Sequence, residues 1–245
     1  MEVALGFTPG EVLIVTGAGS GIGRAVALRG AQVGLAVAAW DLNPQTAQAT
    51  ADEISSAGGT ALAIVADVAD PAAIADGLAA TAALGTARYL ANNAGPPSAV
   101  PLDFDGALVL AVGSMRRMAE AWLATAPPAG ASLVNTASVA GNWIGTGSDW
   151  YTTAKAAIAG YTRYLAAYRS DVVRANAVAP GMTDTPRIAG FAESEMGQRV
   201  LARVPLHRMA TPDEIAWVIL FLLSPLASYI NGALLPIDGG WMVTQ

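Results

Sequence analysis

The sequence predicts an α/β fold in which a doubly wound parallel sheet of about seven strands carries helices on both faces. Short apolar runs alternate along the chain with longer, alanine-rich segments of helical character, and this alternation implies parallel strands joined by right-handed crossovers. The strands lack a strict apolar–polar alternation, as expected for a sheet covered on both faces. Only 13% of the residues are charged and 53% are hydrophobic, which indicates a large buried core.

The expected strands are short apolar runs bounded by turn residues: Val12–Thr16, Leu35–Trp40, Ala61–Ala66, Tyr89–Asn92, Ser132–Thr136, Val172–Val178 and Ala233–Ile237. The expected helices lie between them: Gly21–Gln32, Pro44–Ala57, Pro71–Leu84, Phe104–Thr125, Asp149–Arg169 and Pro212–Leu223. The last helix has an N-cap hydroxyl in Thr211, a proline at its first position and a capping-box glutamate in Glu214. Its apolar run is far shorter than the roughly 20 residues of a membrane span, so we expect a buried helix and no membrane partner.

No repeat, low-complexity tract or linker divides the 245 residues, so we expect a single domain over residues 1–245. Pro127–Gly130 forms a turn, because the strand–helix alternation resumes on both sides of it. Residues 183–206 form a long excursion between a strand and the last helix. An excursion of this length is typical of a functional loop, and it is expected near the carboxyl ends of the strands, where open α/β sheets bind ligands.

Residues that are absent or rare exclude several chemistries. The chain has no cysteine, which excludes disulfides, thiol nucleophiles and thiolate metal sites. Its single histidine, His207, lacks a G-x-S-x-G partner motif, and we expect it to be structural. Carboxylates do not cluster at metal-ligand spacing. The net charge of −6 and the pI near 4.7 disfavour nucleic acid as a partner. Residues 1–10 have no secretory pattern, so a cytoplasmic location is expected.

A glycine-rich run, Gly17-Ala18-Gly19-Ser20-Gly21-Ile22-Gly23, follows the first strand and opens the first helix. Glycines allow the backbone to turn tightly and approach a pyrophosphate, and the helix N-terminus offers unpaired N–H groups to the anion. The position of the run between a strand and a helix is what distinguishes a dinucleotide site from a chance match. The fold is therefore expected to be of the Rossmann type.

Asp41 ends the second strand, 18 residues after Gly23. A carboxylate there accepts hydrogen bonds from the adenosine ribose hydroxyls and repels a 2′-phosphate, which favours NAD over NADP. The alternative interpretation is a helix-capping aspartate ahead of Pro44, and both roles are compatible.

Tyr151 and Lys155 are four residues apart on a predicted helix and so share one face. A neighbouring cation favours phenolate over phenol, which brings the tyrosine pKa closer to neutral pH and suits proton transfer to or from a carbonyl oxygen. Ser138, just after the strand that ends at Thr136, supplies a hydroxyl for the same substrate oxygen.

Together these residues resemble the short-chain dehydrogenase/reductase family, in its single-domain branch, over nearly the whole chain. Six ordered motifs carry the resemblance: Thr16–Gly23 as the cofactor loop, Asp67-Val68 as the adenine-side pair, Asn92-Asn93-Ala94-Gly95 beside the cofactor, the trio Ser138, Tyr151 and Lys155, Asn176–Thr185 near the nicotinamide, and Ile230–Gly240 as the C-terminal signature.

The resemblance implies hydride transfer between NAD and a secondary alcohol or ketone. Tyr151 would be the general acid/base, Lys155 would bind the nicotinamide ribose and lower the tyrosine pKa, and Ser138 would orient the carbonyl. The implied cofactor-binding residues are Gly17, Ser20, Gly21, Ile22, Gly23, Asp41, Leu42, Asp67, Val68, Asn93, Ala94, Gly95, Tyr151, Lys155, Pro180, Gly181, Thr183 and Thr185. It also implies a homotetramer, with contacts through the helices at 104–125 and 215–223 and the C-terminal strand.

One position departs from the family pattern. Gly113 stands where the family has an asparagine that helps to hold a water in a proton relay to the lysine. We expect an active enzyme whose relay uses the Gly113 carbonyl and the Ser114 hydroxyl, or one with impaired proton exchange.

The substrate is expected to be a neutral, apolar or aromatic secondary alcohol or its ketone. Trp143, Trp150, Phe191 and Met196 are the candidate pocket residues, with core or subunit contacts as the equal alternative. No Arg or Lys lies between Ser138 and Tyr151 to anchor an anion, although the excursion carries Arg187 and Arg199.

Three other functions compete with this one. A 3-oxoacyl thioester reductase typically goes with NADP and a basic docking face, against which Asp41 and the acidic pI argue. A cofactor-free dehalogenating lyase on this fold would lack the glycine loop and Lys155. A non-catalytic dinucleotide-sensing protein remains open because of Gly113.

Overall fold

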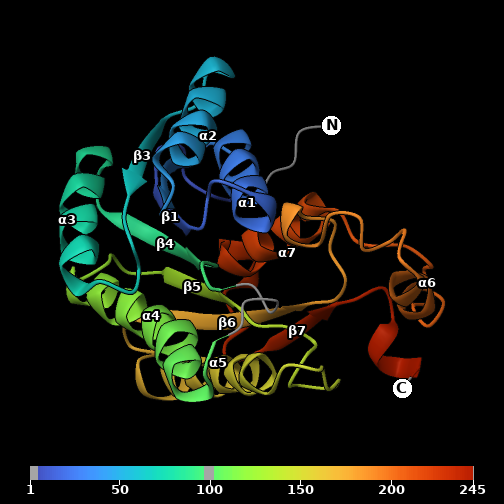
Figure 1. Cartoon of the computed structure of the whole chain (residues 1–245). Helices are drawn as coiled ribbons and strands as arrows, with labels where there is room; N and C mark the ends of the chain where they lie inside the picture. Colours follow the sequence, from blue (N-terminus) through green and yellow to red (C-terminus); the bar gives the residue numbers. More distant parts are fainter. Residues whose placement is uncertain (1–4, 97–101, 245) are drawn as a thin grey trace.

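Seven parallel strands form one sheet in the order β3-β2-β1-β4-β5-β6-β7 (Figure 1). The computed structural model describes residues 5–96 and 102–244. The strands are β1 (Val12–Thr16), β2 (Ala36–Asp41), β3 (Ala61–Val65), β4 (Ala87–Asn92), β5 (Ala131–Thr136), β6 (Val173–Pro180) and β7 (Leu234–Ile237). This confirms the predicted α/β Rossmann-type sheet and its strand count.

The direction of chain progression reverses between β1 and β4, which are hydrogen-bonded neighbours in the middle of the sheet. From β1 the chain runs outward to β3, then returns to pair β4 with β1 and continues to β7. In open α/β sheets ligands bind beyond the carboxyl ends of the strands at such a reversal. The topology therefore fixes where a site is expected.

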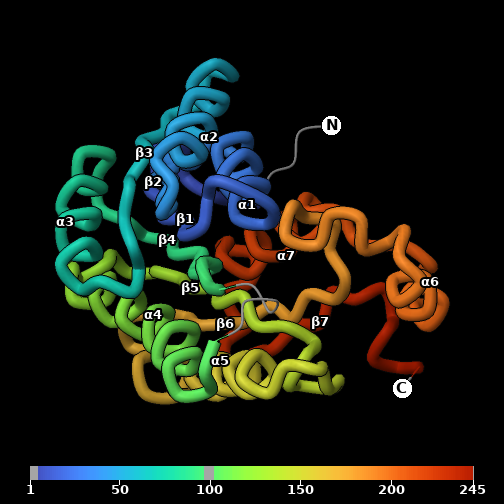
Figure 2. The backbone as a smooth tube through the Cα atoms, viewed as in Figure 1, coloured from blue at the N-terminus to red at the C-terminus, as the bar shows by residue number. Residues whose placement is uncertain are grey.

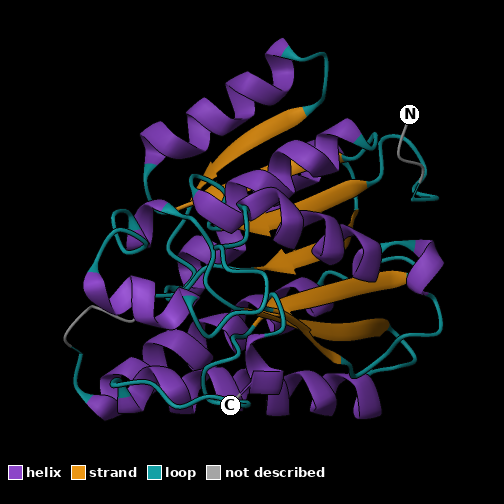
Figure 3. Ribbon diagram, turned by 90° about the vertical axis from the view of Figure 1, so that its right-hand side faces the viewer, coloured by secondary structure: helices purple, strands orange, loops and turns teal. Residues whose placement is uncertain are grey.

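Helices cover both faces of the sheet (Figures 1 and 3). They are α1 (Gly21–Gln32), α2 (Pro44–Ser56), α3 (Pro71–Thr81), α4 (Phe104–Ala124), α5 (Asp149–Tyr168), α6 (Glu195–Leu201) and α7 (Pro212–Leu223), with 3-10 turns η1 (Ala82–Leu84), η2 (Pro186–Ile188), η3 (Pro225–Ala227) and η4 (Trp241–Thr244). One apolar core joins α1, α2 and α7 to the sheet, and a second joins α3, α4 and α5 to the opposite face.

Most apolar residues of α7 are buried within the chain itself. Ile215, Ile219 and Leu220 are fully covered by the core that α7 shares with α1 and the sheet. The close approach of α1 depends on Gly30, because a Cβ there would lie 2.7 Å from Leu13 Cδ2. The apolar character of α7 is thus explained by folding of the monomer and gives no independent indication of a subunit contact.

The excursion after β6 contains structure that the sequence did not predict. It includes η2 and the seven-residue helix α6, whose N-cap Ser194 accepts from Gly197 N–H at 3.0 Å. In Figure 2 the excursion extends away from the sheet to α6 and returns to α7. Thr244 Oγ1 donates to the Arg203 carbonyl at 2.7 Å, so the C-terminal turn η4 is hydrogen-bonded to the last part of the excursion.

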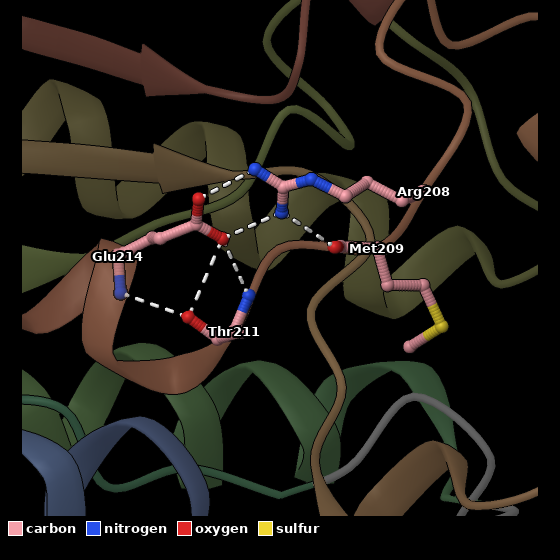
Figure 4. Close-up of polar contacts among 4 residues, drawn as sticks. All are labelled: Arg208, Met209, Thr211 and Glu214. Atoms are coloured by element: carbon pink, nitrogen blue, oxygen red, sulfur yellow. Dashed lines mark hydrogen bonds and ion pairs between the residues drawn. The ribbon is translucent and has the colours of Figure 1, made fainter.

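The start of α7 is held by a capping box (Figure 4). The Glu214 carboxylate accepts from Thr211 N–H at 2.8 Å and from two nitrogens of Arg208 at 2.6 and 2.7 Å. Just before the cap, Ala210 N–H donates to the Met182 carbonyl at 2.9 Å. The cap therefore anchors the segment that follows β6.

Predicted and observed elements differ mainly at their ends. β6 continues two residues beyond the predicted Val178, because Ala179 and Pro180 still pair with β7. Within residues 5–96 and 102–244, no helix is both long and apolar enough to span a membrane.

Candidate active site

A cavity of about 430 Å³ lies beyond the carboxyl ends of the central strands. Its lining includes Gly17 after β1, Asp41 at the end of β2, Asn93 after β4, Thr136 at the end of β5 and Pro180 at the end of β6. The cavity therefore occupies the position that the strand reversal predicts for a ligand.

The glycine loop forms one wall of the cavity with tightly packed backbone. Gly17 and Gly21 have φ angles of 68° and 52°, which favour glycine. A Cβ on Gly23 would lie 2.0 Å from the Gly17 carbonyl oxygen, so only glycine fits there. Ser20, the N-cap of α1, makes no side-chain capping hydrogen bond, which leaves first-turn N–H groups without a side-chain partner. These features fit a pyrophosphate.

Hydrogen bonds hold the glycine loop against the end of β4. Thr16 Oγ1 accepts from Asn93 N–H at 2.9 Å and from Ala94 N–H at 3.0 Å, and Asn93 Nδ2 donates to the Thr16 carbonyl at 3.3 Å. Asn92 Nδ2 donates to the Met115 carbonyl of α4 at 2.8 Å. The Asn92-Asn93-Ala94 segment thus joins β1, β4 and α4, and Asn93 lines the cavity.

The Asp41 carboxylate faces the glycine loop and the cavity. Its Oδ2 accepts from Gly19 N–H at 2.8 Å and its Oδ1 from Asn43 N–H at 2.9 Å. The N-cap of α2 is Asn43, whose side chain accepts from Gln45 and Thr46. Asp41 is therefore not the helix cap that the alternative interpretation required, and it remains available to ribose hydroxyls.

Twelve of the eighteen expected cofactor residues line the cavity, and six lie outside its wall. Leu42 is exposed, and exposed Asp67 accepts from Ala69 N–H at 2.8 Å. The remaining predicted residues outside the wall are Gly23, Val68, Ala94 and Gly95, whereas Gly17, Ser20, Gly21, Ile22, Asp41, Asn93, Tyr151, Lys155, Pro180, Gly181, Thr183 and Thr185 all line it.

The predicted catalytic trio meets at the cavity. Ser138 lies two residues after β5, and Tyr151 and Lys155 occupy successive turns of α5. Asn142, which sequence reasoning missed, donates from Nδ2 to the Ser138 carbonyl at 2.8 Å and to the Lys155 carbonyl at 3.3 Å. It clamps the Ser138 loop onto α5.

Close contact between the Ser138 loop and α5 requires glycine at position 141. Gly141 has a φ of 78°, and a Cβ there would lie 1.9 Å from the Thr152 carbonyl oxygen. No motif signals this position, because the requirement comes from the approach of two separate segments.

Lys155 is the only lysine of the chain. Its Nζ donates to the Thr136 carbonyl at 2.9 Å and lies 5.6 Å from the centre of the Tyr151 ring. Burial, followed by the positive charge of Arg187, lowers the pKa of Lys155 to about 8. The group therefore stays mainly charged at pH 7 but titrates much closer to neutral pH than an ordinary lysine.

Burial raises the pKa of the Tyr151 phenol, and it outweighs the lowering by the Ser138 hydrogen bond and the Arg187 charge. This net direction differs from the expectation that the neighbouring lysine lowers the tyrosine pKa. The spacing of Tyr151 and Lys155 on a helix predicts a positive charge near the phenol. It does not predict that the phenol is removed from solvent, which raises the pKa. Arg187 is the second cation near the reacting groups, and it lines the cavity.

Gly113 lies on α4, away from the cavity wall. A Cβ there would lie 3.0 Å from Nη1 of Arg117, whose guanidinium fills the space beside the glycine. Ser114 is buried and does not line the cavity either. The relay through the Gly113 carbonyl and the Ser114 hydroxyl stays a prediction.

The four expected pocket residues do not reach the cavity wall. Trp150 is buried in a small core of α4 and α5 with its ring centre 5.6 Å from that of Tyr151, while Trp143 and Met196 are 40% and 61% exposed. Phe191 is half-buried on the excursion. Side chains that sequence reasoning missed line the cavity instead: Ile144, Thr146, Met182, Ile188 and Trp241.

Two other expectations concern histidine and metals. His207 is exposed, has a φ of 51° and does not line the cavity, and its structural role stays a prediction. In the part of the chain that the structure describes, no group of three or more His, Asp or Glu side chains is placed to hold a metal ion.

A glycine loop at the reversal of a parallel sheet, with Ser, Tyr and Lys in one cavity, defines a class of dinucleotide-binding enzymes. A family model described as enoyl-(acyl carrier protein) reductase matches residues 17–242. Cyclohexanol dehydrogenase of Acinetobacter sp. (strain SE19) is 34% identical, and 4-formylbenzenesulfonate dehydrogenase of Comamonas testosteroni is 39% identical; each match covers 94% of this chain, and 94% and 97% of the relatives.

Solved structures agree with this assignment. A 7α-hydroxysteroid dehydrogenase complexed with NADH and 7-oxo glycochenodeoxycholic acid superposes with a TM-score of 0.88 at 30% identity, over 95% of this chain and 94% of that one. A short-chain dehydrogenase from Burkholderia cenocepacia in complex with NADP has a TM-score of 0.87 at 31% identity, over 95% and 98%. The chain belongs to the short-chain dehydrogenase/reductase family and is an oxidoreductase that uses a nicotinamide cofactor.

Proposed function

We propose that this protein is an NAD-dependent dehydrogenase that interconverts a secondary alcohol and its ketone. The observation that carries the proposal is one cavity with Asp41 at the glycine-loop end and Ser138, Tyr151 and Lys155 at the other. Asp41 is already hydrogen-bonded to the loop. Its hydrogen-bond partners within the described residues are Gly19, Asn43 and Thr46, and none of these carries a positive charge that would neutralise a 2′-phosphate. This arrangement supports NAD over NADP.

The bound cofactor would supply the hydride acceptor or donor. In the oxidising direction Tyr151 takes the proton from the substrate hydroxyl while Ser138 hydrogen-bonds the same oxygen. The positive charge of Arg187 lowers the Tyr151 pKa against the effect of burial, and the Lys155 ammonium, 5.6 Å from the centre of the ring, would favour the phenolate in the same direction. In the reducing direction the Tyr151 phenol returns the proton to the developing alkoxide.

The substrate body is proposed to be compact and largely apolar. Ile144, Met182, Ile188 and Trp241 provide apolar surface beside the reacting groups. Relatives named for cyclohexanol and for cis-4-hydroxycyclohexanecarboxylate support a ring of that size carrying the alcohol.

A 3-oxoacyl thioester reductase is the second candidate, because the matching family model bears an acyl-carrier reductase description. Asp41 and the acidic pI of 4.7 argue against it, since they disfavour NADP and an acidic carrier protein.

A homotetramer in the cytoplasm is proposed together with this function. Val109 of α4, 63% exposed, and Val243 at the C-terminal end, 77% exposed, are apolar side chains that subunit contacts would cover. A monomer in sedimentation equilibrium at micromolar concentration would contradict the tetramer.

Initial rates of cofactor reduction test the function. Purified enzyme is given NAD or NADP with cyclohexanol, with acyclic secondary alcohols and with a 3-hydroxyacyl thioester. We expect NAD reduction by cyclic alcohols and loss of at least about 1,000-fold in Tyr151→Phe, the scale of general acid–base catalysis. Exclusive turnover of the thioester with NADP would overturn the proposal in favour of the second candidate.

A further inference from the structure

Arg187, on the excursion after β6, lies at the wall of the cavity. It lies in η2, two residues after the cavity residue Thr185, and itself lines the cavity. Its Nη2 donates to the Gly95 carbonyl at 2.7 Å, which links the excursion to the segment after β4. The two segments flank the cavity, so the guanidinium is held at its wall.

In the described part of the chain, the Arg187 guanidinium is paired with no carboxylate. Within residues 5–96 and 102–244, Arg187 forms no ion pair, and the cavity lining has one carboxylate, Asp41, at the glycine-loop end. Six other arginines are paired with Asp or Glu: Arg24, Arg29, Arg88, Arg169, Arg199 and Arg208. Among the described residues that line the reacting end of the cavity there are two cations, Arg187 and Lys155, and no carboxylate.

The charge of Arg187 acts on the reacting groups. It lowers the pKa of both the Tyr151 phenol and the Lys155 ammonium, so it lies near enough to each to affect proton binding. A guanidinium has five N–H donors in a planar fork that matches carboxylate or sulfonate, and the Gly95 carbonyl takes one. Several donors remain for a ligand.

We propose that Arg187 binds an anionic group, a carboxylate or sulfonate, on the substrate of the Ser138–Tyr151–Lys155 site, and so selects hydroxy and oxo acids over neutral analogues. This inference rests on the proposed dehydrogenase function. It replaces the neutral substrate expected from the sequence, where Arg187 and Arg199 were equivalent. The structure separates them: both side chains are exposed, but Arg187 lines the cavity, whereas Arg199 is paired with Glu195 on α6 and does not line it.

The cofactor diphosphate is the competing partner for Arg187. The glycine loop and the N-terminus of α1 already offer backbone donors for that group. Arg187 lines the same cavity as Ser138, Tyr151 and Lys155, and its charge lowers the pKa of the phenol and of the ammonium that would meet the substrate oxygen. The geometry therefore favours the substrate.

Kinetics with a matched pair of substrates test the proposal. 4-Hydroxycyclohexanecarboxylate and its carboxamide share ring and alcohol and differ in charge. At saturating NAD we expect the wild-type kcat/KM to be at least about 10-fold higher for the acid than for the amide. Arg187→Gln should lower kcat/KM by about 10–100-fold with the acid, which is the value of a charged hydrogen bond. With the amide, the same substitution should lower kcat/KM by less than about 3-fold. Arg187→Lys should keep part of the preference. Arg199→Gln, the matched control on the same excursion, should leave both substrates unchanged.

Binding provides a second readout that needs no turnover. The affinity of the enzyme–NADH complex for cyclohexanecarboxylate and for cyclohexanecarboxamide is measured by calorimetry. We expect the wild type to bind the acid, and Arg187→Gln to weaken that binding by the factor given above for kcat/KM. The Kd for NADH should be the same in both proteins. A raised Kd for NADH with an unaltered acid-to-amide ratio would assign Arg187 to the diphosphate and overturn the proposal. Equal wild-type binding of acid and amide would also overturn it. Arg187-dependent acid binding without oxidation of any alcohol would leave the anion site standing and reject the dehydrogenase proposal instead.

Discussion

Replacing Lys155 by methionine should stabilise the protein while abolishing its proposed activity. Lys155 is largely buried and has no carboxylate partner in the described part of the chain, and its pKa falls from 10.5 to about 8. This difference corresponds to about 3 kcal/mol of disfavoured charge at pH 7. Methionine fills a similar volume without charge.

Two effects reduce that value. Solvent reaches part of the side chain from the cavity, and the variant loses the 2.9 Å hydrogen bond from Nζ to the Thr136 carbonyl, which contributes about 1 kcal/mol. A net gain of about 1–2 kcal/mol remains, or a rise in Tm of about 3–6 °C for a chain of this size. The measurement is thermal and urea unfolding of wild type and Lys155→Met at equal concentration without cofactor.

The stability difference between Lys155→Met and wild type should change with pH in a defined direction. Because the folded pKa lies below the unfolded one, the penalty is complete below about pH 8 and disappears as pH rises toward 10.5. The stability difference between variant and wild type should therefore narrow over this interval. Since Lys155 is the only lysine, the ε-nitrogen signal of protein labelled with ¹⁵N-lysine reports its titration alone. A midpoint above pH 10, or a variant less stable than wild type at pH 7, would refute the reasoning.

Three further predictions concern the cofactor end and the scaffold. Asp41→Ser should raise the ratio of kcat/KM with NADP to that with NAD by about 10–100-fold, because it removes charge repulsion of the 2′-phosphate; an unchanged ratio in paired steady-state assays would argue against the assignment. Gly23→Ala places a Cβ 2.0 Å from the Gly17 carbonyl oxygen and should raise the Kd for NADH at least about 10-fold in fluorescence titration. The control is Gly160→Ala, at an exposed helical position with open space around it. It should leave the Kd for NADH unchanged and stabilise the fold by up to about 1 kcal/mol. Thr211→Ala removes the α7 cap and should destabilise the fold by about 1 kcal/mol in urea unfolding, with Thr211→Ser retaining stability.

The fold was predictable from local signals. Strand–helix alternation, the glycine run and the caps each act over a few residues, and the order of β1 and β4 follows from crossovers of one handedness. Gly21–Gln32 and Pro212–Leu223 have the predicted bounds, because an adjacent glycine turn and a capping box mark their starts.

The cavity wall was less predictable, since it depends on contacts between distant segments. Ser138, Tyr151 and Lys155 meet there as expected, but Asn142 acts through carbonyls on a loop and a helix. Trp143 was expected in the wall from its place near Tyr151 in the sequence. Loop geometry leaves it 40% exposed, outside the wall.

Isotope transfer tests the central claim most directly. The enzyme is incubated with NAD and a secondary alcohol that carries deuterium at the carbinol carbon, and the mass of the NADH formed is measured. The account predicts NADH heavier by one deuterium, no incorporation when the label is in the solvent, and no transfer with Tyr151→Phe. NADH without the label, or undiminished transfer in Tyr151→Phe, would contradict hydride transfer at the Ser138–Tyr151–Lys155 site.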